Sequence, residues 1–256
     1  MENKKLILVT NDDGYQAGGF KSLIEAVRHL GEVVAVAPWE AQSGMSHAIT
    51  VKQPLRVHKI REENGLTVYA VNGTPVDCVK LAINQLMPRR PDLLVSGINH
   101  GSNSSTSILY SGTMGAALEG SINMIPSIGF SHICYSPDID FGTSIKYSNL
   151  ISQKVLENGL PKNICLNVNF PDAEIDNVAG IKVCRQTMGY WREEFDKRID
   201  PIGKEYFWLT GFYHNEEPEA QDTDEWALKN NYVSIVPVQT DLTSYETIKL
   251  INKWDF

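Results

Sequence analysis

The sequence KLILVTNDDG, residues 5–14, decides the fold. Its apolar residues Leu6 to Val9 follow one another without alternation, which is typical of a strand buried on both faces of a parallel sheet. Asp12 and Asp13 come directly after it, at the end of the strand where open α/β sheets bind their ligands. Adjacent carboxylates repel each other unless a cation lies between them. Residues 11–14 are also all turn formers, so an ordinary turn followed by a helix cap is the alternative.

The pattern that follows this strand alternates between helix and strand. Residues 18–30 place apolar side chains at helical spacing, and residues 32–37 read as a second buried strand. Further strands are predicted over 91–96, 126–131 and 164–168, and helices over 74–86, from Thr113 onward and over 144–160. We therefore expect an α/β fold with a doubly wound, mostly parallel, Rossmann-like sheet over about residues 1–170.

Other segments depart from that alternation. Residues 49–57 and 66–71 predict a small hairpin around a polar turn at 61–65. In the second half we expect β segments over 181–185 and 206–212 with a charged, aromatic stretch between them (191–197), an acid-rich irregular region over 215–225, a strand over 232–238 and a terminal helix over 244–254.

The domain prediction is a single domain, residues 1–256. Its core is expected to comprise about 1–170 and 226–256, and its C-terminal β-rich extension, an arm, about 181–225. Such an arm pairs with a second subunit or forms an edge hairpin on its own chain, and both are ordinary.

Composition excludes some classes of function. The formal net charge of −8 argues against binding nucleic-acid polymers or an anionic membrane surface, because either needs a basic patch. The apolar run before Asn11 is too short for a signal-peptide core, and no apolar run approaches the ~20 residues that cross a membrane. Four widely spaced cysteines in apolar contexts predict buried free thiols, which suits a reducing cytoplasm. They are Cys78, Cys134, Cys165 and Cys184.

Polar side chains follow three of the predicted strands. Asp12 and Asp13 follow the first, Ser43 the second, and Asn99 the strand that ends at Ser96. All are oxygen donors, and hard oxygen ligands select Mg²⁺, Mn²⁺ or Ca²⁺ over Zn²⁺. With only two formal negative charges in this set, the charge of a bound divalent ion is balanced but not exceeded, so the ion can still bind water and a phosphate oxygen.

Residues 111–113 offer a candidate phosphate cradle. Ser111, Gly112 and Thr113 stand where a helix is predicted to begin, and the amides of a helix N-terminus carry partial positive charge. A serine or threonine helix cap, which needs no ligand, is the alternative.

Five sequence blocks together resemble the SurE (survival protein E) family of metal-dependent nucleoside monophosphate phosphatases, in order and in spacing. The blocks are Asn11-Asp12-Asp13-Gly14, Ser43-Gly44, Gly73-Thr74-Pro75-x-Asp77-Cys78, Ser96-Gly97-Ile98-Asn99-x-Gly101-x-Asn103 and Tyr110-Ser111-Gly112-Thr113. The resemblance is dense from Leu6 to about Ser131 and thinner beyond, through 167–169 and 241–243.

The resemblance implies a function and a set of site residues. It implies hydrolysis of nucleoside 5′- or 3′-monophosphates, with some action on polyphosphate, and one divalent cation per subunit, Mg²⁺ or Mn²⁺. The implied metal ligands are Asp12, Asp13, Ser43 and Asn99, and the implied phosphate-binding residues are Asn99, Asn103, Ser111, Gly112 and Thr113. We expect Asp12, Asp13 and Asn99 to be catalytic. It also implies a homodimer or homotetramer, commonly formed by exchange of C-terminal elements.

Some positions depart from the family pattern. His100 and residues 102–107 replace a commoner acidic loop, and Tyr245 stands where many relatives have histidine, so we assign Tyr245 no role. His100 has two interpretations, a proton donor to the leaving group or an ordinary loop residue, and we favour the second. Two alternative functions fit the sequence less well. A phosphatase that uses Asp12 as nucleophile would be expected to have Asp-x-Asp rather than Asp-Asp. A receiver-like binding module without catalytic turnover would be expected to have about half this length.

Overall fold

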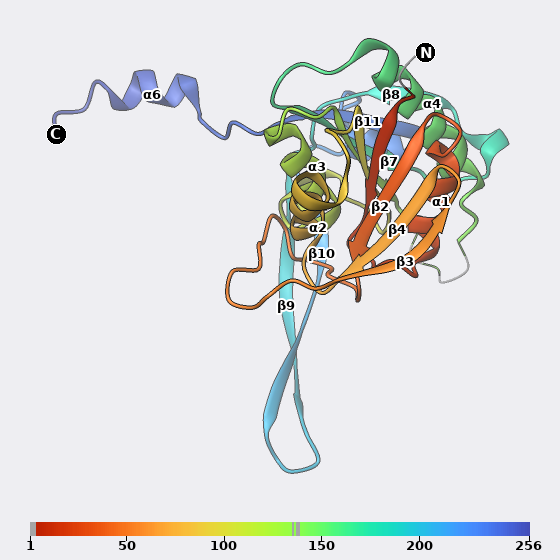
Figure 1. The fold of residues 1–256 in the computed structure, drawn as a ribbon. Coiled ribbons are helices and arrows are strands. Elements are labelled where there is room, and N and C mark those ends of the chain that lie inside the picture. Colours follow the sequence, from red (N-terminus) through yellow and green to blue (C-terminus); the bar gives the residue numbers. More distant parts are fainter. Residues whose placement is uncertain (1–3, 135, 137–138) are drawn as a thin grey trace.

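The computed structural model describes residues 4–134, 136 and 139–256. Within them a nine-stranded sheet has the order β3-β4-β2-β1-β5-β6-β7-β11-β8, and a separate hairpin, β9-β10, extends from the body (Figure 1). The strands are β1 (Leu6–Thr10), β2 (Glu32–Pro38), β3 (Val57–Glu63), β4 (Leu66–Val71), β5 (Leu93–His100), β6 (Ser127–His132), β7 (Ile164–Phe170), β8 (Gly180–Val183), β9 (Gly189–Ile199), β10 (Glu205–Asn215) and β11 (Tyr232–Gln239). The helices are α1 (Gly18–Val27), α2 (Pro75–Leu81), α3 (Gly112–Ile122), α4 (Gly142–Asn158), α5 (Asp224–Lys229) and α6 (Tyr245–Ile251).

The sheet is mostly parallel. The strands from β4 through β2, β1, β5 and β6 to β7 all pair in parallel, whereas β3 and β11 run antiparallel to their neighbours β4 and β7. The predicted α/β fold with a doubly wound, mostly parallel sheet is therefore confirmed. Its domain boundaries stay a prediction, and residues 1–3, 135, 137 and 138 of that range lie outside the described residues.

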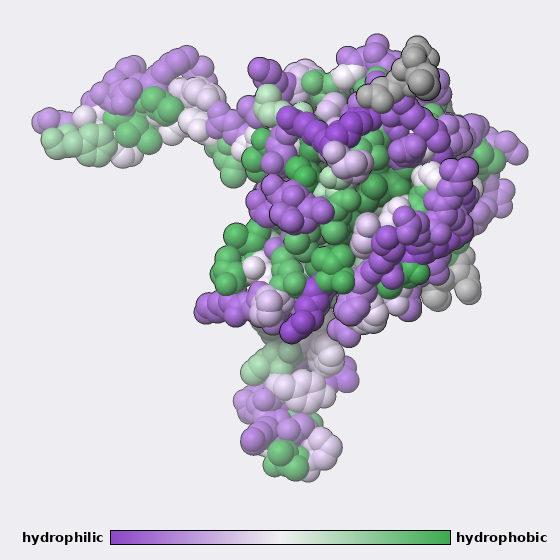
Figure 2. All heavy atoms as spheres, in the orientation of Figure 1, coloured by the Kyte–Doolittle hydropathy of each residue, from purple (hydrophilic) through white to green (hydrophobic). Residues whose placement is uncertain are grey.

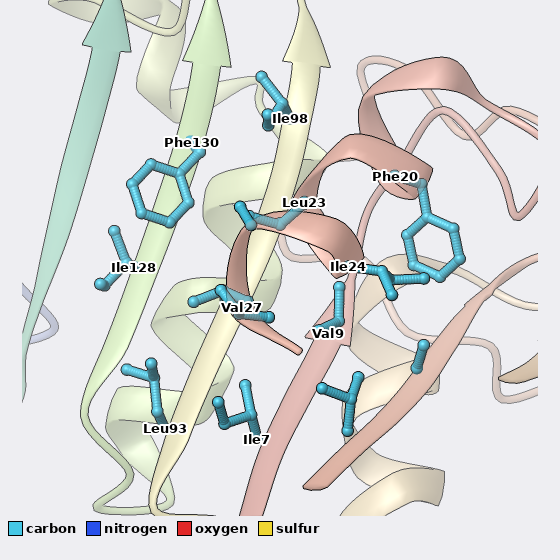
Figure 3. Packing of buried hydrophobic residues seen from close by; sticks show 14 of the residues in the cluster. Ile7, Val9, Phe20, Leu23, Ile24, Val27, Leu93, Ile98, Ile128 and Phe130 are labelled. Atoms are coloured by element: carbon cyan, nitrogen blue, oxygen red, sulfur yellow. The ribbon is translucent and has the colours of Figure 1, made fainter. Parts of the chain in front are cut away.

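Strand β1 is buried on both faces, as its unbroken apolar run predicts. Ile7 and Val9 face α1 and α4, and Leu6 and Leu8 face α2 and α3, so each layer of helices has its own core. Figure 3 shows Ile7 and Val9 beside the apolar side chains of α1. Burying one such side chain stabilises the fold by roughly 1.5–3 kcal/mol.

Helix α1 lies directly on β5. A Cβ on Gly19 would come within 2.0 Å of the carbonyl oxygen of Ile98, a distance that no side chain can occupy. Only glycine at this position lets the helix approach the strand so closely. This close contact fixes the position of β5, and therefore that of Asn99, relative to the first turn of α1.

The predicted hairpin exists, but its first strand begins later. Residues 49–56 contain no strand, and β3 starts at Val57 and turns through Asn64-Gly65 into β4. Asn-Gly is a strong signal for a two-residue hairpin turn, and Gly65 has the positive φ of +78° that such turns use. The hairpin forms one edge of the central sheet, since β4 pairs with β2.

The C-terminal half differs from prediction in three elements. The charged stretch 191–197 is part of strand β9, which pairs antiparallel with β10 over its whole length. Strand β8 joins the central sheet beside β11. The projecting hairpin therefore covers Gly189–Asn215, and helix α5 occupies part of the region expected to be irregular.

Helix α6 extends away from the body (Figure 1), and none of its residues is buried. All four cysteines are free thiols, as predicted. Cys78, Cys165 and Cys184 are buried, whereas Cys134 is half-buried, so the prediction of burial is wrong for Cys134. Burial raises the pKa of Cys165 to about 12. Among the described residues, no helix combines the length and apolar character that crossing a membrane requires.

Candidate active site

Asp12 lies at the centre of the site, in the turn after β1, and is almost fully buried. Its Oδ1 accepts a hydrogen bond from the hydroxyl of Thr113. Burial raises the pKa of Asp12 to about 6, with a further contribution from the Asp13 carboxylate, while the hydroxyl and amide of Thr113 oppose the rise. The ionised form is therefore unfavourable here unless a cation compensates its charge.

Asp13 is half-buried beside it. Its Oδ2 accepts a hydrogen bond of 3.1 Å from the backbone amide of His100, at the end of β5. Burial raises the pKa of Asp13, and the amide and charge of His100 lower it. No lysine or arginine of the described residues forms an ion pair with Asp12 or Asp13. The backbone amide of His100, which sequence reasoning did not single out, thus ties the two strand ends together.

Asn99 lies on β5 itself, whereas we expected it in the following loop. The strand continues to His100 after an irregularity between Ser96 and Asn99. The side-chain Nδ2 of Asn99 donates to the carbonyl of Gly101 at 2.8 Å. Because that bond holds the amide group in one orientation, its Oδ1 remains as an acceptor for a ligand.

Ser43 reaches the site on the loop after β2. The amide of the preceding residue, Gln42, donates to the carbonyl of Asp12 at 2.7 Å, so the loop is bound to the Asp12 turn. Ser43 itself is exposed, and its hydroxyl has no hydrogen bond within the described part of the chain. Further along the loop, Nε2 of His47 lies 2.9 Å from the Glu119 carboxylate, which also pairs with Lys80.

The N-terminus of α3 closes the site on a further side. Ser111 caps the helix, since its Oγ accepts a 3.0 Å hydrogen bond from the amide of Met114. A Cβ on Gly112 would lie 2.8 Å from the Cβ of Asp12, so only glycine lets the helix start against this carboxylate. The predicted helix start is confirmed, and the cap does not prevent the Ser111 hydroxyl from donating to a ligand.

Asn103 is held in a buried network rather than in an open loop. Its backbone amide donates to Oδ1 of Asn169 at 2.8 Å, and its Nδ2 donates to the Ser131 hydroxyl at 2.7 Å. Asn167 donates in turn to the carbonyl of Asn103. These bonds fix the loop that carries Asn103 against β6 and β7, and its role toward phosphate stays a prediction.

Asp224 anchors the same loop and was not expected from sequence. It is fully buried, and its carboxylate accepts hydrogen bonds from the amides of Ser105 at 2.8 Å and Thr187 at 3.0 Å, and from the Thr187 hydroxyl. The Ser105 hydroxyl also contacts Tyr213 at the base of the hairpin. No local pattern links residues more than a hundred positions apart, so no signal in the sequence could have revealed this anchor.

The residues brought together fit a hard divalent cation. Asp12, Asp13, Ser43 and Asn99 offer oxygen only, and among the described residues no group of three or more His, Cys, Asp or Glu side chains is placed to hold a metal ion. Beside them, the buried Oδ1 of Asn11 has no hydrogen-bond partner in the described structure, while its Nδ2 holds the carbonyl of Gly14. Adjacent carboxylates, neutral oxygen donors and an unpaired buried acceptor are the surroundings that Mg²⁺ or Mn²⁺ prefers.

Known proteins resemble this chain over nearly its full length. The family model described as Survival protein SurE matches residues 7–193. The protein named 5′-nucleotidase SurE from Flavobacterium psychrophilum is 52% identical over 254 residues, covering 99% of this chain and 98% of the relative. The protein of the same name from Phocaeicola vulgatus is 49% identical with the same coverage. The crystal structure of the SurE protein from Aquifex aeolicus matches with a TM-score of 0.83 at 40% identity, covering 96% of this chain and 98% of that one.

Proposed function

Because the chain belongs to the SurE family, we propose that it is a 5′-nucleotidase, which hydrolyses nucleoside 5′-monophosphates to a nucleoside and phosphate. The observation that carries this proposal is the convergence of Asp12, Asp13 and Asn99 with the N-terminus of α3. Carboxylates that hold a cation beside helix amides are suited to a phosphate group, whose charge both would offset.

The proposed site holds one divalent cation per subunit, Mg²⁺ or Mn²⁺, through Asp12, Asp13, Ser43 and Asn99. When bound, such an ion lowers the pKa of a water molecule and offsets charge on the phosphoryl group. Within the described residues, Oδ1 of Asn99 and the hydroxyl of Ser43 have no hydrogen-bond partner, and this supports the ligand set.

The chain's own residues then orient the reactants. Thr113 fixes the Asp12 carboxylate, while Asp13, which is more exposed, accepts the proton of the attacking water as general base. Asn99, Asn103, Ser111 and the amide of Gly112 hold the phosphate oxygens, while Thr113 contributes through Asp12, which its hydroxyl and amide contact. Since the helix amides point outward from α3, they stabilise charge that builds up on those oxygens during transfer.

Removing metal will abolish hydrolysis and leave the fold intact. The test is phosphate release from nucleoside 5′- and 3′-monophosphates and short polyphosphate, with Mg²⁺, Mn²⁺ or EDTA. We expect EDTA to lower the rate on 5′-monophosphates by roughly 100-fold or more, and added Mn²⁺ or Mg²⁺ to restore it. Circular dichroism in EDTA controls for unfolding. A full rate of phosphate release in EDTA would contradict the proposed metal site. No phosphate release under any condition would contradict the proposed nucleotidase activity.

We also propose that the subunits associate as a homodimer or homotetramer through the hairpin and the C-terminal segment. Apolar side chains stand exposed on both, among them Phe195 and Trp208 on the hairpin and Trp254 after α6. Figure 2 shows hydrophobic residues among the hydrophilic ones on the surface of both segments. A cavity of about 780 Å³, lined by residues 236–244 and the apolar side of α3, lies where the chain leaves the body. Exposed apolar surface of this kind is covered by a partner in most proteins.

Sedimentation velocity tests the assembly. We expect the full chain to sediment as a dimer or tetramer, and Phe195→Asp with Trp208→Asp to shift it toward smaller species, because charge placed in an apolar contact opposes association. A matched exposed substitution on the body, Lys21→Asp, should leave the assembly unchanged. A monomer at every concentration would contradict the proposal.

The free thiols support a reducing compartment such as the cytoplasm.

A further inference from the structure

Three aromatic rings form an exposed row on the rim of the sheet that carries the active site. The ring of Trp39, directly after β2, lies 5.2 Å from that of Tyr15 and 5.2 Å from that of His58. Trp39 is 44% exposed, His58 is exposed, and Tyr15 is half-buried. We refer to Tyr15, Trp39 and His58 as the aromatic row.

The aromatic row is continuous with the proposed metal site. Tyr15 follows Asp13 by two residues, so their Cα atoms are at most ~7.6 Å apart. The amide of Tyr15 donates to the carbonyl of Pro38 at 3.0 Å, which joins the Asp12-Asp13 turn to the residue before Trp39. The loop that begins with Trp39 goes on to Ser43, so one segment supplies both a ring and a metal ligand.

The ring of Trp39 is not part of the buried core. The Trp39 backbone is held by its amide, which donates to the carbonyl of Val71 at 2.7 Å, while its ring remains half in solvent between two tilted rings. Large aromatic side chains that stay exposed beside a polar site are typical of ligand contact. Such faces stack on nucleobases, since every base has an apolar π-face.

The groups suited to a phosphate lie at the other end of this segment. Glu40, an exposed carboxylate, follows Trp39 directly, whereas the proposed cation site and the N-terminus of α3 lie around Asp12. The phosphate end of a nucleotide therefore belongs at the cation site, and its base at the aromatic row.

We propose that Trp39, flanked by Tyr15 and His58, is the stacking surface for the base of the nucleotide substrate. This rests on the proposed nucleotidase function and adds to it where the base binds. The strength of stacking depends on the area of the nucleobase ring rather than on its hydrogen-bonding pattern. The enzyme therefore accepts several bases and prefers purines to pyrimidines.

The test compares a substrate that has a base with one that lacks it. For Trp39→Ala we expect KM for adenosine 5′-monophosphate to rise about 5- to 100-fold with kcat little changed, and KM for ribose 5-phosphate to change less than about 2-fold. The matched variant Trp39→Phe keeps an aromatic face and should stay within about 3-fold of wild type on both. Equal effects on the two substrates, or none on either, would overturn the proposal.

A binding measurement separates this proposal from the proposed function. In the Asp12→Asn background, adding Trp39→Ala should weaken calorimetric binding of adenosine 5′-monophosphate by a similar factor. If that holds while wild type hydrolyses no nucleotide, the nucleotidase assignment fails and the stacking surface stands. If wild type hydrolyses nucleotides and binding is independent of Trp39, the stacking surface fails and the nucleotidase assignment stands.

Discussion

Replacing Asp12 by asparagine is expected to remove nearly all phosphatase activity and, at the same time, to stabilise the metal-free protein at neutral pH. Asparagine has the same shape and still accepts the hydrogen bond of Thr113, so the turn after β1 is kept. The substitution removes one of the two formal charges of the proposed cation site. We expect kcat to fall by roughly 100-fold or more, as for other removals of a metal ligand with its charge.

The stability effect follows from the pKa of Asp12, which burial raises from 3.8 to about 6. Because the folded-state pKa is the higher one, the protonated carboxyl gives full stability below pH 4. That stability is lost as pH rises to about 6, since the unfolded chain ionises first. The total loss is on the order of 3 kcal/mol, and asparagine, which does not ionise, avoids it.

Thermal unfolding in EDTA from pH 4 to 8 measures this difference. The Tm of Asp12→Asn should exceed that of wild type by an amount that grows up to about pH 6 and is constant above it. Added Mn²⁺ should stabilise wild type and reverse the order. Asp176→Asn, at an exposed carboxylate, serves as the control and should change neither activity nor the pH dependence. A variant with wild-type activity would remove Asp12 from the site.

The second large effect is expected at Asp224, far from the phosphate. Asp224→Ala leaves three buried donors unpaired, namely the amides of Ser105 and Thr187 and the hydroxyl of Thr187. Each unsatisfied buried group costs about 1–3 kcal/mol, so we expect a loss of at least roughly 3 kcal/mol in the free energy of unfolding. Ser105 stands two residues after Asn103, so the phosphate-side loop is also released.

Urea unfolding and steady-state kinetics check this prediction together. We expect a lower urea midpoint and, under conditions where the variant is still folded, a higher KM for nucleotides. Asp222→Ala is the matched control, since Asp222 is exposed and paired with Arg185, and exposed pairs contribute less than about 1 kcal/mol. Equal midpoints for the two variants would show that the Asp224 network does not hold the loop.

Sequence reasoning succeeded where burial leaves a local pattern. The run Leu6 to Val9 predicted a two-sided strand, and Thr74-Pro75 with Asp77 predicted a capped helix, which the structure shows as a reciprocal capping box. It failed for β9, whose sequence is dominated by charged residues that are uncommon in strands. The equally exposed β10 was predicted from its aromatic residues.

In the candidate site too, some features follow from a local sequence pattern and others depend on packing between distant segments. Asp12, Asp13 and Asn99 were predictable because the ends of parallel strands meet at one edge of the sheet. The contacts of Thr113 with Asp12 and of Asp224 with Ser105 join residues more than a hundred positions apart. Such pairings depend on how the layers pack, and no single segment encodes them.

The placement of β11 has a consequence for biosynthesis. This strand fills the gap between β7 and β8, yet it is among the last elements of the chain to be made. Roughly 70 residues separate the end of β7 from the end of β11, a delay on the order of 3–14 s during translation. Throughout it, the nascent sheet presents β7 as an unpaired edge to other chains. The hairpin and α5 are therefore made before the strand that closes the sheet, so pairing of β7 with a second chain competes with correct folding during this interval.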